Sequence, residues 1–158
     1  MKLYIKQKVF SWRDRFTIKD ENENDRYFAE GEFFTLGKQL HVYDESGRAV
    51  AHIRQKLMSL MPRFIIEVHG REACEIVQKF RLTRHTFDIH GLPLNLDGDF
   101  WGHEYDLFQG SQIIMQLSKK WFTWGDSYEM NIADSNQELV CLCIALAVDC
   151  ALAVSRNN

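Results

Sequence analysis

Three side chains in the middle of the chain are of types that bind transition metals. They are His85, Asp88 and His90, and imidazole and carboxylate groups are common metal ligands. On a β-strand, Asp88 and His90 would share one face and His85 would lie on the other, because successive side chains alternate. A complete site would need a further ligand from elsewhere. The other candidates are His52, His69 and His103. We interpret these histidines as scattered surface residues and predict no metal site.

A second group of polar residues matches part of a calcium-binding loop. Asn95, Asp97, Asp99 and Asp106 occupy positions 1, 3, 5 and 12 of the EF-hand pattern. Position 6, which requires glycine, is Phe100, and position 12 is normally glutamate. The sequence LDGD is better explained as a hairpin turn, so we predict no calcium site.

No familiar catalytic or cofactor motif occurs in the chain. The patterns GxSxG, HExxH and GxGxxG and the P-loop are absent, and no matched pair of nucleophile and base stands out in the sequence. We therefore predict no catalytic residues and no cofactor, and expect that the protein is not an enzyme. The net charge of −3 gives no electrostatic reason to expect binding to nucleic acid.

Asp149 is the most unusual titratable residue of the chain. It interrupts the run from Leu139 to Val154, in which the other fifteen residues are Leu, Val, Ile, Ala or Cys. A buried carboxyl group must accept a hydrogen bond or become protonated. We expect Asp149 to bond the backbone or an inward polar side chain such as Gln7 or Gln78. The alternative is an ion or polar-ligand site at one end of the fold.

The aromatic turn at residues 121–126 is one candidate for a contact surface. Trp121, Trp124 and Asp126 follow directly on Lys119 and Lys120. Amphipathic tryptophan rings beside lysines suit a membrane interface or the rim of a ligand site. The alternative is a structural role, in which the rings cap the fold and Asp126 holds the turn.

The apolar loop at residues 57–62 is the other candidate. It contains Met58 and Met61 among further apolar residues, and an exposed apolar patch of this kind marks a partner or lipid contact. The alternative is a lid that folds down over a core. Residues 54–84 also carry seven Lys or Arg against three Glu, a basic excess that could meet an anionic surface.

The run from Leu139 to Val154 predicts a helix that is apolar on every side, whereas a surface helix keeps a polar face. Sixteen helical residues span roughly 24 Å, less than the ~30 Å of a bilayer core. We therefore predict a buried core helix rather than a membrane anchor. Ser135 and Glu138, with Asp134 before them, match a capping box at its start.

The four cysteines predict no disulfide. Cys141, Cys143 and Cys150 lie on the predicted helix and Cys74 lies in a strand-like run, and cysteines on one helix do not meet the geometry of a disulfide. Since no signal peptide precedes them, we interpret them as reduced, buried groups and expect a cytoplasmic protein.

The remainder of the chain predicts twelve short β-strands. Apolar and polar residues alternate with period 2, and glycine-containing turns such as ESGR, HGRE and QGSQ separate the runs. The predicted strands lie at Leu3–Val9, Phe16–Ile18, Tyr27–Phe34, Gln39–Tyr43, Val50–Lys56, Phe64–Val68, Cys74–Phe80, Phe87–Ile89, Leu92–Leu96, Tyr105–Leu107, Ile113–Leu117 and Tyr128–Ile132.

These elements favour a single domain, residues 1–158, built as a closed antiparallel barrel. A flat sheet of twelve strands would leave two open edges and cover one side of the helix only. A closed barrel of about twelve strands is too wide for its own side chains to fill, because about eight strands already suffice for that. The apolar C-terminal helix is the candidate to fill it.

Three stretches of the sequence resemble signatures of the LURP-one-related family. They are QKLMSLMPRF at 55–64, GDFWGHEYDL at 98–107 and SKKWFTWGDSYEMNIAD at 118–134, and the resemblance extends over essentially the whole chain. It implies a tubby C-terminal-like fold, shared with phospholipid scramblases, in which a twelve-stranded barrel surrounds a central hydrophobic helix. It implies no catalytic residues. This sequence does not contain the cysteine- and proline-rich N-terminal region of the scramblases.

We therefore predict a non-catalytic binding or interaction module. Its expected contacts are an anionic membrane surface or a protein partner, through the basic strands and the apolar loops. The alternative is a small-ligand-binding protein or an enzyme with a cleft near Trp121, Trp124 and Asp126.

Overall fold

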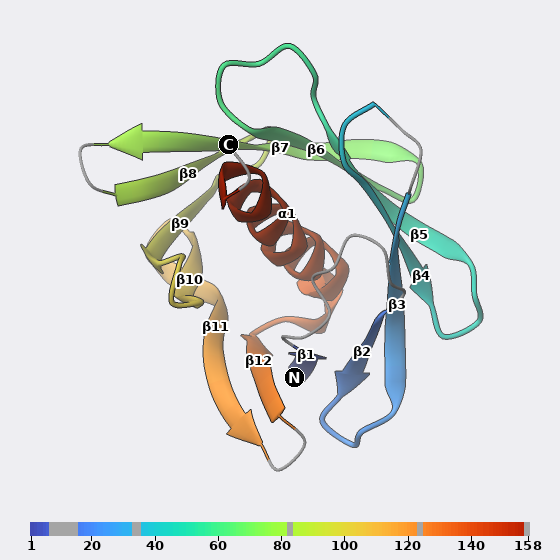
Figure 1. The fold of residues 1–158 in the computed structure, drawn as a ribbon. Coiled ribbons are helices and arrows are strands. Elements are labelled where there is room, and N and C mark those ends of the chain that lie inside the picture. Colours follow the sequence, from blue (N-terminus) through green and yellow to red (C-terminus); the bar gives the residue numbers. More distant parts are fainter. Residues whose placement is uncertain (7–15, 33–35, 82–83, 123–124, 157–158) are drawn as a thin grey trace.

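The computed structural model describes residues 1–6, 16–32, 36–81, 84–122 and 125–156. Twelve antiparallel strands and one long helix make up this part of the chain (Figure 1). The strands are β1 (Lys2–Lys6), β2 (Phe16–Asp20), β3 (Asp25–Gly31), β4 (Gln39–Asp44), β5 (Ala49–Gln55), β6 (Arg63–Val68), β7 (Arg71–Arg81), β8 (Arg84–His90), β9 (Leu94–Asp99), β10 (Glu104–Gln109), β11 (Gln112–Phe122) and β12 (Gly125–Ile132). A short 3-10 helix, η2 (Ser135–Gln137), leads into α1 (Glu138–Arg156). The predicted strands and helix are confirmed within the described residues, and positions 7–9 and 33–34 of two predicted strands lie outside them. The prediction of a hairpin turn at LDGD is wrong: residues 96–99 lie in β9, and the turn to β10 follows at 100–103.

The strands form one sheet that curls into a nearly closed barrel. The hydrogen-bonded order is β8-β7-β6-β5-β4-β3-β2-β1-β12-β11-β10-β9, so neighbours in sequence are neighbours in space and β1 joins the two halves by pairing with β12. The order ends at β8 on one side and β9 on the other. These two edge strands lie beside each other and form what we call the seam of the barrel (Figure 1).

The alternation of side chains sets which face of each strand looks inward. In β4, Leu40 and Val42 are buried while His41 and Tyr43 between them are partly exposed, as the period of 2 predicts. The turn after β4 is closed by Asp44, whose Oδ1 accepts from the backbone N–H of Ser46 at 3.0 Å. Such self-bonding is why aspartate favours turns.

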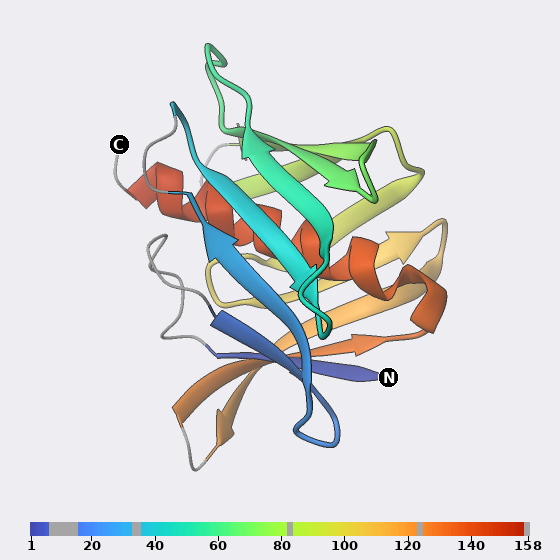
Figure 2. The ribbon, with the colours of Figure 1, turned by 90° about the vertical axis from the view of Figure 1, so that its right-hand side faces the viewer.

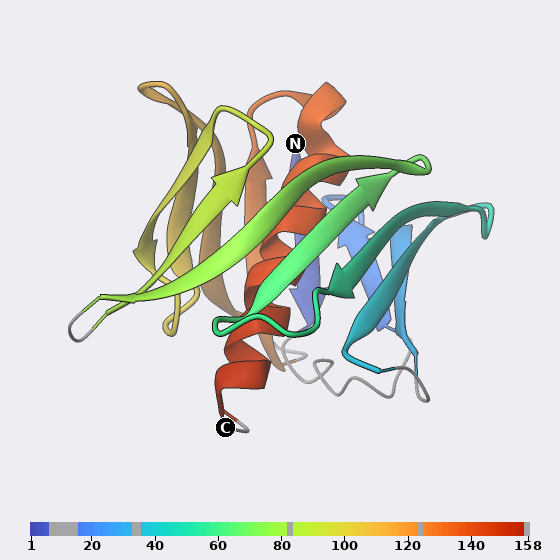
Figure 3. The ribbon, with the colours of Figure 1, turned by 90° about the horizontal axis from the view of Figure 1, so that it is seen from above.

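Helix α1 occupies the inside of the barrel, as predicted (Figures 1 and 3). Every residue from Cys141 to Cys150 is buried, and inward residues of the strands, such as Leu3, Ile53 and Met130, are fully buried in the same core. The four cysteines are free and buried, and burial raises the pKa of the Cys74 thiol to about 12.

Burial, rather than length, separates α1 from a membrane span. The helix has 19 residues, longer than the predicted sixteen, and its segment is long and apolar enough to cross a bilayer by length and composition. Most of that segment is nevertheless buried inside the protein. The length of the helix therefore does not by itself distinguish it from a membrane span. The assignment of α1 as a core helix rests on its enclosure by the sheet.

The start of α1 differs from the predicted capping box. Asp134, not Ser135, caps the preceding turn, and its side chain accepts from the backbone N–H of Asn136 at 2.9 Å. Glu138 is buried and accepts two hydrogen bonds from Arg26 of β3, at 2.9 and 3.2 Å. Glu138 therefore attaches the helix to the barrel wall instead of capping its own first turn.

Two side chains depart from the alternation of their strands. The pairing of β10 with β11 steps from Leu107–Met115 to Phe108–Ile113, so Ile114 is the extra residue of a bulge in β11. Ile114 is buried, whereas Ile113, which is in phase with the buried Met115 and Leu117, is exposed. Phe80 continues the inward pattern of β7 but is exposed, because it lies next to the end of that strand, beyond the packed core.

Candidate functional site

The two ends of the barrel collect different connections. Because neighbouring strands alternate in direction, the connections at 36–38, 56–62 and 100–103 lie at the end where α1 finishes, which we call the C-end (Figure 3). The connections at 21–24, 45–48, 69–70, 91–93 and 110–111 lie at the opposite end, the N-end. Figure 2 shows α1 running between the two ends.

Exposed apolar side chains gather at the C-end. Seven large apolar residues are exposed among the described residues. Those at the C-end are Leu36, Leu57, Met58, Leu60, Phe80 and Trp101. Ile113, at the N-end, is the exception. Met58 and Leu60 are fully exposed, so the alternative of a lid folded over the core is wrong for this part of the loop.

Two connections of the C-end support each other. The backbone N–H of Gln55 donates to the carbonyl of Lys38 at 2.8 Å, and its Oε1 accepts from the Lys38 N–H at 3.0 Å. A Cβ atom added to Gly37, whose φ is +84°, would lie 2.8 Å from Leu57 Cδ2. Glycine at this position therefore lets the 36–38 and 56–62 connections pack together, which brings Leu36 near the apolar loop.

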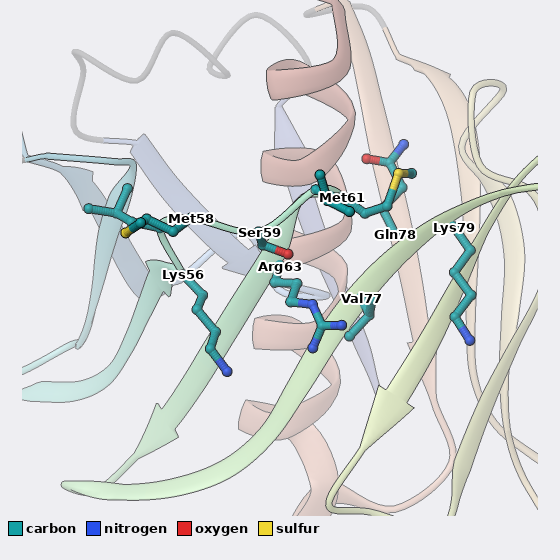
Figure 4. Close-up of a pocket in the computed structure, with 10 residues that line it drawn as sticks. Lys56, Met58, Ser59, Met61, Arg63, Val77, Gln78 and Lys79 are labelled. Carbon is teal, nitrogen blue, oxygen red and sulfur yellow. The ribbon is translucent and has the colours of Figure 1, made fainter.

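A groove of about 470 Å³ lies between the 56–62 connection and β7. Met58 and Met61 contribute to it from the loop, and Val77 and Lys79 from the strand (Figure 4). Lys56 and Arg63, which also line it, each approach Glu75 Oε1 at 3.6 Å.

Charge is also divided between the ends. The described basic residues at or near the C-end are Lys38, Lys56, Arg63, Lys79, Arg81, Arg84, Lys119, Lys120 and Arg156. The acidic ones, with the partners of Lys56, Arg63 and Lys79 included, are Glu30, Glu32, Glu75, Asp88, Asp97, Asp99 and Glu104. Lys79 pairs with Asp88. Among the described residues, no ion pair engages Arg81, Arg84 or Lys120, so these side chains carry much of the positive charge of this end. The N-end has a modest acidic excess. Its described acids are Asp20, Glu21, Glu23, Asp25, Asp44, Glu45, Glu72 and Asp134, against the bases Lys2, Lys19, Arg26, Arg48 and Arg71.

The predicted contact residues belong to the C-end as far as the structure describes them. Lys120 is exposed and Lys119 is partly buried, and Met61 lies partly buried beside the exposed Met58. The pairing of β11 with β12 brings the backbone of Trp121 opposite that of Asp126. The side chains of these two residues, and the whole of Trp124, lie outside the described residues.

Asp149 has a partner that we did not predict. Its Oδ1 lies 2.8 Å from Nε2 of His103, and both residues are buried. Burial raises the pKa of Asp149, and the hydrogen bond from His103 opposes that rise. The His103 ring also stacks on Tyr128, with 4.2 Å between the ring centroids.

The partners predicted for Asp149 are not observed. Gln78 is fully buried but bonds to His85 and Ser155, and Gln7 lies outside the described residues. His103, which we interpreted as a surface residue, is buried. No local sequence pattern indicates that His103 is buried. Its inward position depends on a φ of +57° in a tight connection, and its partner lies 46 residues away in the sequence.

The described residues contain no group of three or more potential metal ligands. His85 bonds to Gln78, Asp88 pairs with Lys79, and His90 faces Glu75, so the first candidate set is dispersed. In the calcium-like set, Asp99 Oδ1 accepts from the backbone N–H of Gly102 at 3.0 Å, which is a turn contact.

Comparison with known proteins identifies the family. A family model described as LURP-one-related matches residues 1–149. The chain belongs to the LURP-one-related family. A relative named "Uncharacterized protein YxjI", from Bacillus subtilis (strain 168), is 42% identical over 152 residues, which cover 96% of this chain and 94% of the relative.

A solved structure supports the same fold. The X-ray structure of the Arabidopsis thaliana protein AT5G01750 covers 94% of this chain and 89% of its own, with a TM-score of 0.63 and 15% identity. The match to the family model confirms the LURP-one-related resemblance, and the solved structure supports the barrel with its internal helix. At this level of identity the likeness concerns the fold alone.

Proposed function

We propose that this LURP-one-related protein is a non-catalytic binding module that docks on an anionic phospholipid surface through the C-end of its barrel. The observation that supports it is that exposed apolar side chains lie at the same end as Arg81, Arg84 and Lys120, which no ion pair engages among the described residues, with an N-end of acidic excess opposite. Apolar side chains that enter the headgroup region and basic residues beside them are the two contributions of peripheral membrane binding.

The division of charge favours an anionic surface. Each Lys or Arg near such a membrane contributes about 1 kcal/mol to the free energy of binding. We expect Arg81, Arg84 and Lys120 to make this contribution. The acidic N-end would be repelled, so the two ends together orient the molecule. Anionic lipids are enriched in the cytoplasmic leaflet, in keeping with the cytoplasmic location that we expect from the sequence.

The buried His103–Asp149 pair supports a non-catalytic role. A histidine–carboxylate pair of this kind can serve a nucleophile in enzymes. Here both residues are buried and the His103 ring stacks on Tyr128, so the imidazole is packed in the core and we assign the pair a structural role.

Sedimentation with vesicles tests the proposal. Phosphatidylcholine vesicles with and without phosphatidylserine are compared at low and high salt, for the native protein and for a Met58→Ser/Leu60→Ser variant. We expect binding that requires phosphatidylserine, weakens with salt, and falls at least about tenfold in the variant, because burying such side chains is worth ~1.5–3 kcal/mol each.

Ile113→Ser is the matched control, because Ile113 is an exposed apolar residue at the opposite end. It should bind vesicles as the native protein does. No lipid-dependent sedimentation at low salt, or an equal loss in the Ile113→Ser control, would overturn the proposal and leave the protein-partner alternative for the same surface.

A further inference from the structure

The seam between β8 and β9 is the one interruption in the hydrogen-bonded order of the described strands. The two strands are joined by the short connection 91–93 at the N-end and run toward the C-end as separate edges. An edge strand presents backbone N–H and C=O groups that another extended chain can pair with.

A cleft of about 510 Å³ opens at the C-end of this seam. One wall is the start of β8, with Arg84, His85 and Thr86. The other wall is the end of β9, with Asp97 and Asp99. The volume lies within the range of small-ligand sites.

Gly98 shapes the wall on the β9 side. Its φ is +138°, and a Cβ atom at this position would lie 2.6 Å from the Cα of Tyr105 in β10. Only glycine permits so close an approach in this conformation. The strand therefore lies tightly against β10, and no side chain of residue 98 fills the cleft.

The two walls carry opposite charge. Arg84 and Asp97 are both exposed, and neither has a charged partner among the described residues. Asp99 is also exposed, and its Oδ1 is engaged by the Gly102 N–H. A cationic wall facing an acidic wall favours a ligand that carries both charges.

His85 is held in one orientation from the core. Ser155 of α1 donates to Gln78 Oε1 at 2.7 Å, and Gln78 Nε2 bonds to His85 Nδ1 at 2.8 Å. With Gln78 Oε1 accepting from Ser155, Gln78 Nε2 donates to His85 Nδ1, and in this arrangement the Nε2–H of His85 is the donor that a ligand would meet. Gln78 is fully buried, so this donor is positioned before any ligand arrives.

The apolar floor is also fixed by the helix. Trp101 packs edge-on against His85, with 5.1 Å between ring centroids, and the guanidinium of Arg156 lies 4.7 Å above its ring. Phe100 packs on Phe87 at 4.8 Å. Both floor residues belong to the 100–103 connection, which the His103–Asp149 hydrogen bond attaches to α1.

We propose that the seam binds a short peptide with free termini, in extended conformation. Its carboxylate lies at Arg84 and His85, its ammonium group at Asp97 and Asp99, and an apolar side chain on the floor. The opposite charges of the walls select a zwitterion, and the two strand edges select a peptide backbone over other zwitterions. The inference is independent of membrane docking.

Calorimetric titration with the dipeptide leucyl-phenylalanine, in the absence of lipid, tests it. We expect the free dipeptide to bind, and its N-acetylated and C-amidated derivatives to bind at least about tenfold more weakly, because each loses a charge-assisted hydrogen bond. Arg84→Gln should weaken binding of the free dipeptide to a similar extent but leave binding of the C-amidated derivative unchanged.

Arg71→Gln is the matched control, since Arg71 is an exposed arginine at the N-end, and it should bind the dipeptide as the native protein does. The Met58→Ser/Leu60→Ser variant should also retain dipeptide binding, which separates this site from the membrane proposal. No binding of the free dipeptide, equal binding of the blocked derivatives, or an equal loss in Arg71→Gln would overturn the inference.

Discussion

Asp149 and His103 show how a charged residue is accommodated in an apolar helix. A buried carboxyl group without a partner would destabilise the fold strongly, and the alternation of strands alone offers no polar group at the right place. The 100–103 connection supplies one by turning His103 inward through a left-handed backbone conformation, a cost that the hydrogen bond at 2.8 Å offsets.

Removing the carboxyl group should destabilise the protein. We expect Asp149→Ala to lower the free energy of unfolding by roughly 3–5 kcal/mol, because it leaves His103 buried without its partner. Asp149→Asn should cost less, since an amide oxygen still accepts from His103. Urea unfolding measures both, and an unchanged midpoint for Asp149→Ala would contradict the structural role of the pair.

The pH dependence of stability gives a second readout on the same residue. Burial raises the pKa of Asp149 above its ordinary 3.8. At pH values between 3.8 and this raised pKa, the native state therefore binds more protons than the unfolded state. The contribution of Asp149 to the free energy of unfolding therefore falls as the pH rises through this window and is constant above it. The stability of the native protein relative to Asp149→Asn should decrease as the pH rises from about 4. An increase would mean that the hydrogen bond from His103 outweighs burial.

At the scale of elements, local pattern predicts most of the architecture. Twelve strands follow from period-2 alternation, and the interior position of α1 follows from its lack of a polar face. The details that were missed depend on partners distant in sequence. The bulge at Ile114 turns Ile113 outward, and Glu138 bonds to Arg26, 112 residues away in the sequence. The seam also escaped prediction, because alternation along a strand does not show which neighbours pair.

The attachment of α1 to β3 can be tested through Arg26. Arg26→Ala should lower the free energy of unfolding by about 1–3 kcal/mol, because it leaves the Glu138 carboxylate buried without its two hydrogen bonds. The loss is smaller than for a fully buried pair because Arg26 is itself 39% exposed. Arg26→Lys should restore little of it, since an ammonium group does not reproduce the bidentate geometry. Thermal unfolding measures the series, and full stability of Arg26→Ala would show that the pair is dispensable.

On the scale of the whole molecule, one helix organises both the core and the C-end. Its last turns reach Gln78 through Ser155 and Trp101 through Arg156, and Asp149 holds the connection that carries the cleft floor. The helix that fills the barrel therefore also positions the proposed peptide site. Destabilising α1 should affect peptide binding before it affects the apolar loop at 56–62, which protrudes from the barrel.

Because α1 fills the core, we also predict that the barrel does not fold stably without this helix. A chain ending at residue 135 should fail to unfold cooperatively and should aggregate, because a barrel of twelve strands is too wide for its own side chains to fill and its inward faces would be exposed. Co-expression of residues 136–158 as a separate chain should recover a soluble complex with a cooperative thermal transition, since the contacts of α1 with the strands do not require the covalent connection. Circular dichroism melting curves of the truncated chain, with and without the added segment, show whether cooperative unfolding depends on α1. A soluble truncated chain that melts cooperatively would show that the sheet closes on its own and that α1 is an accessory.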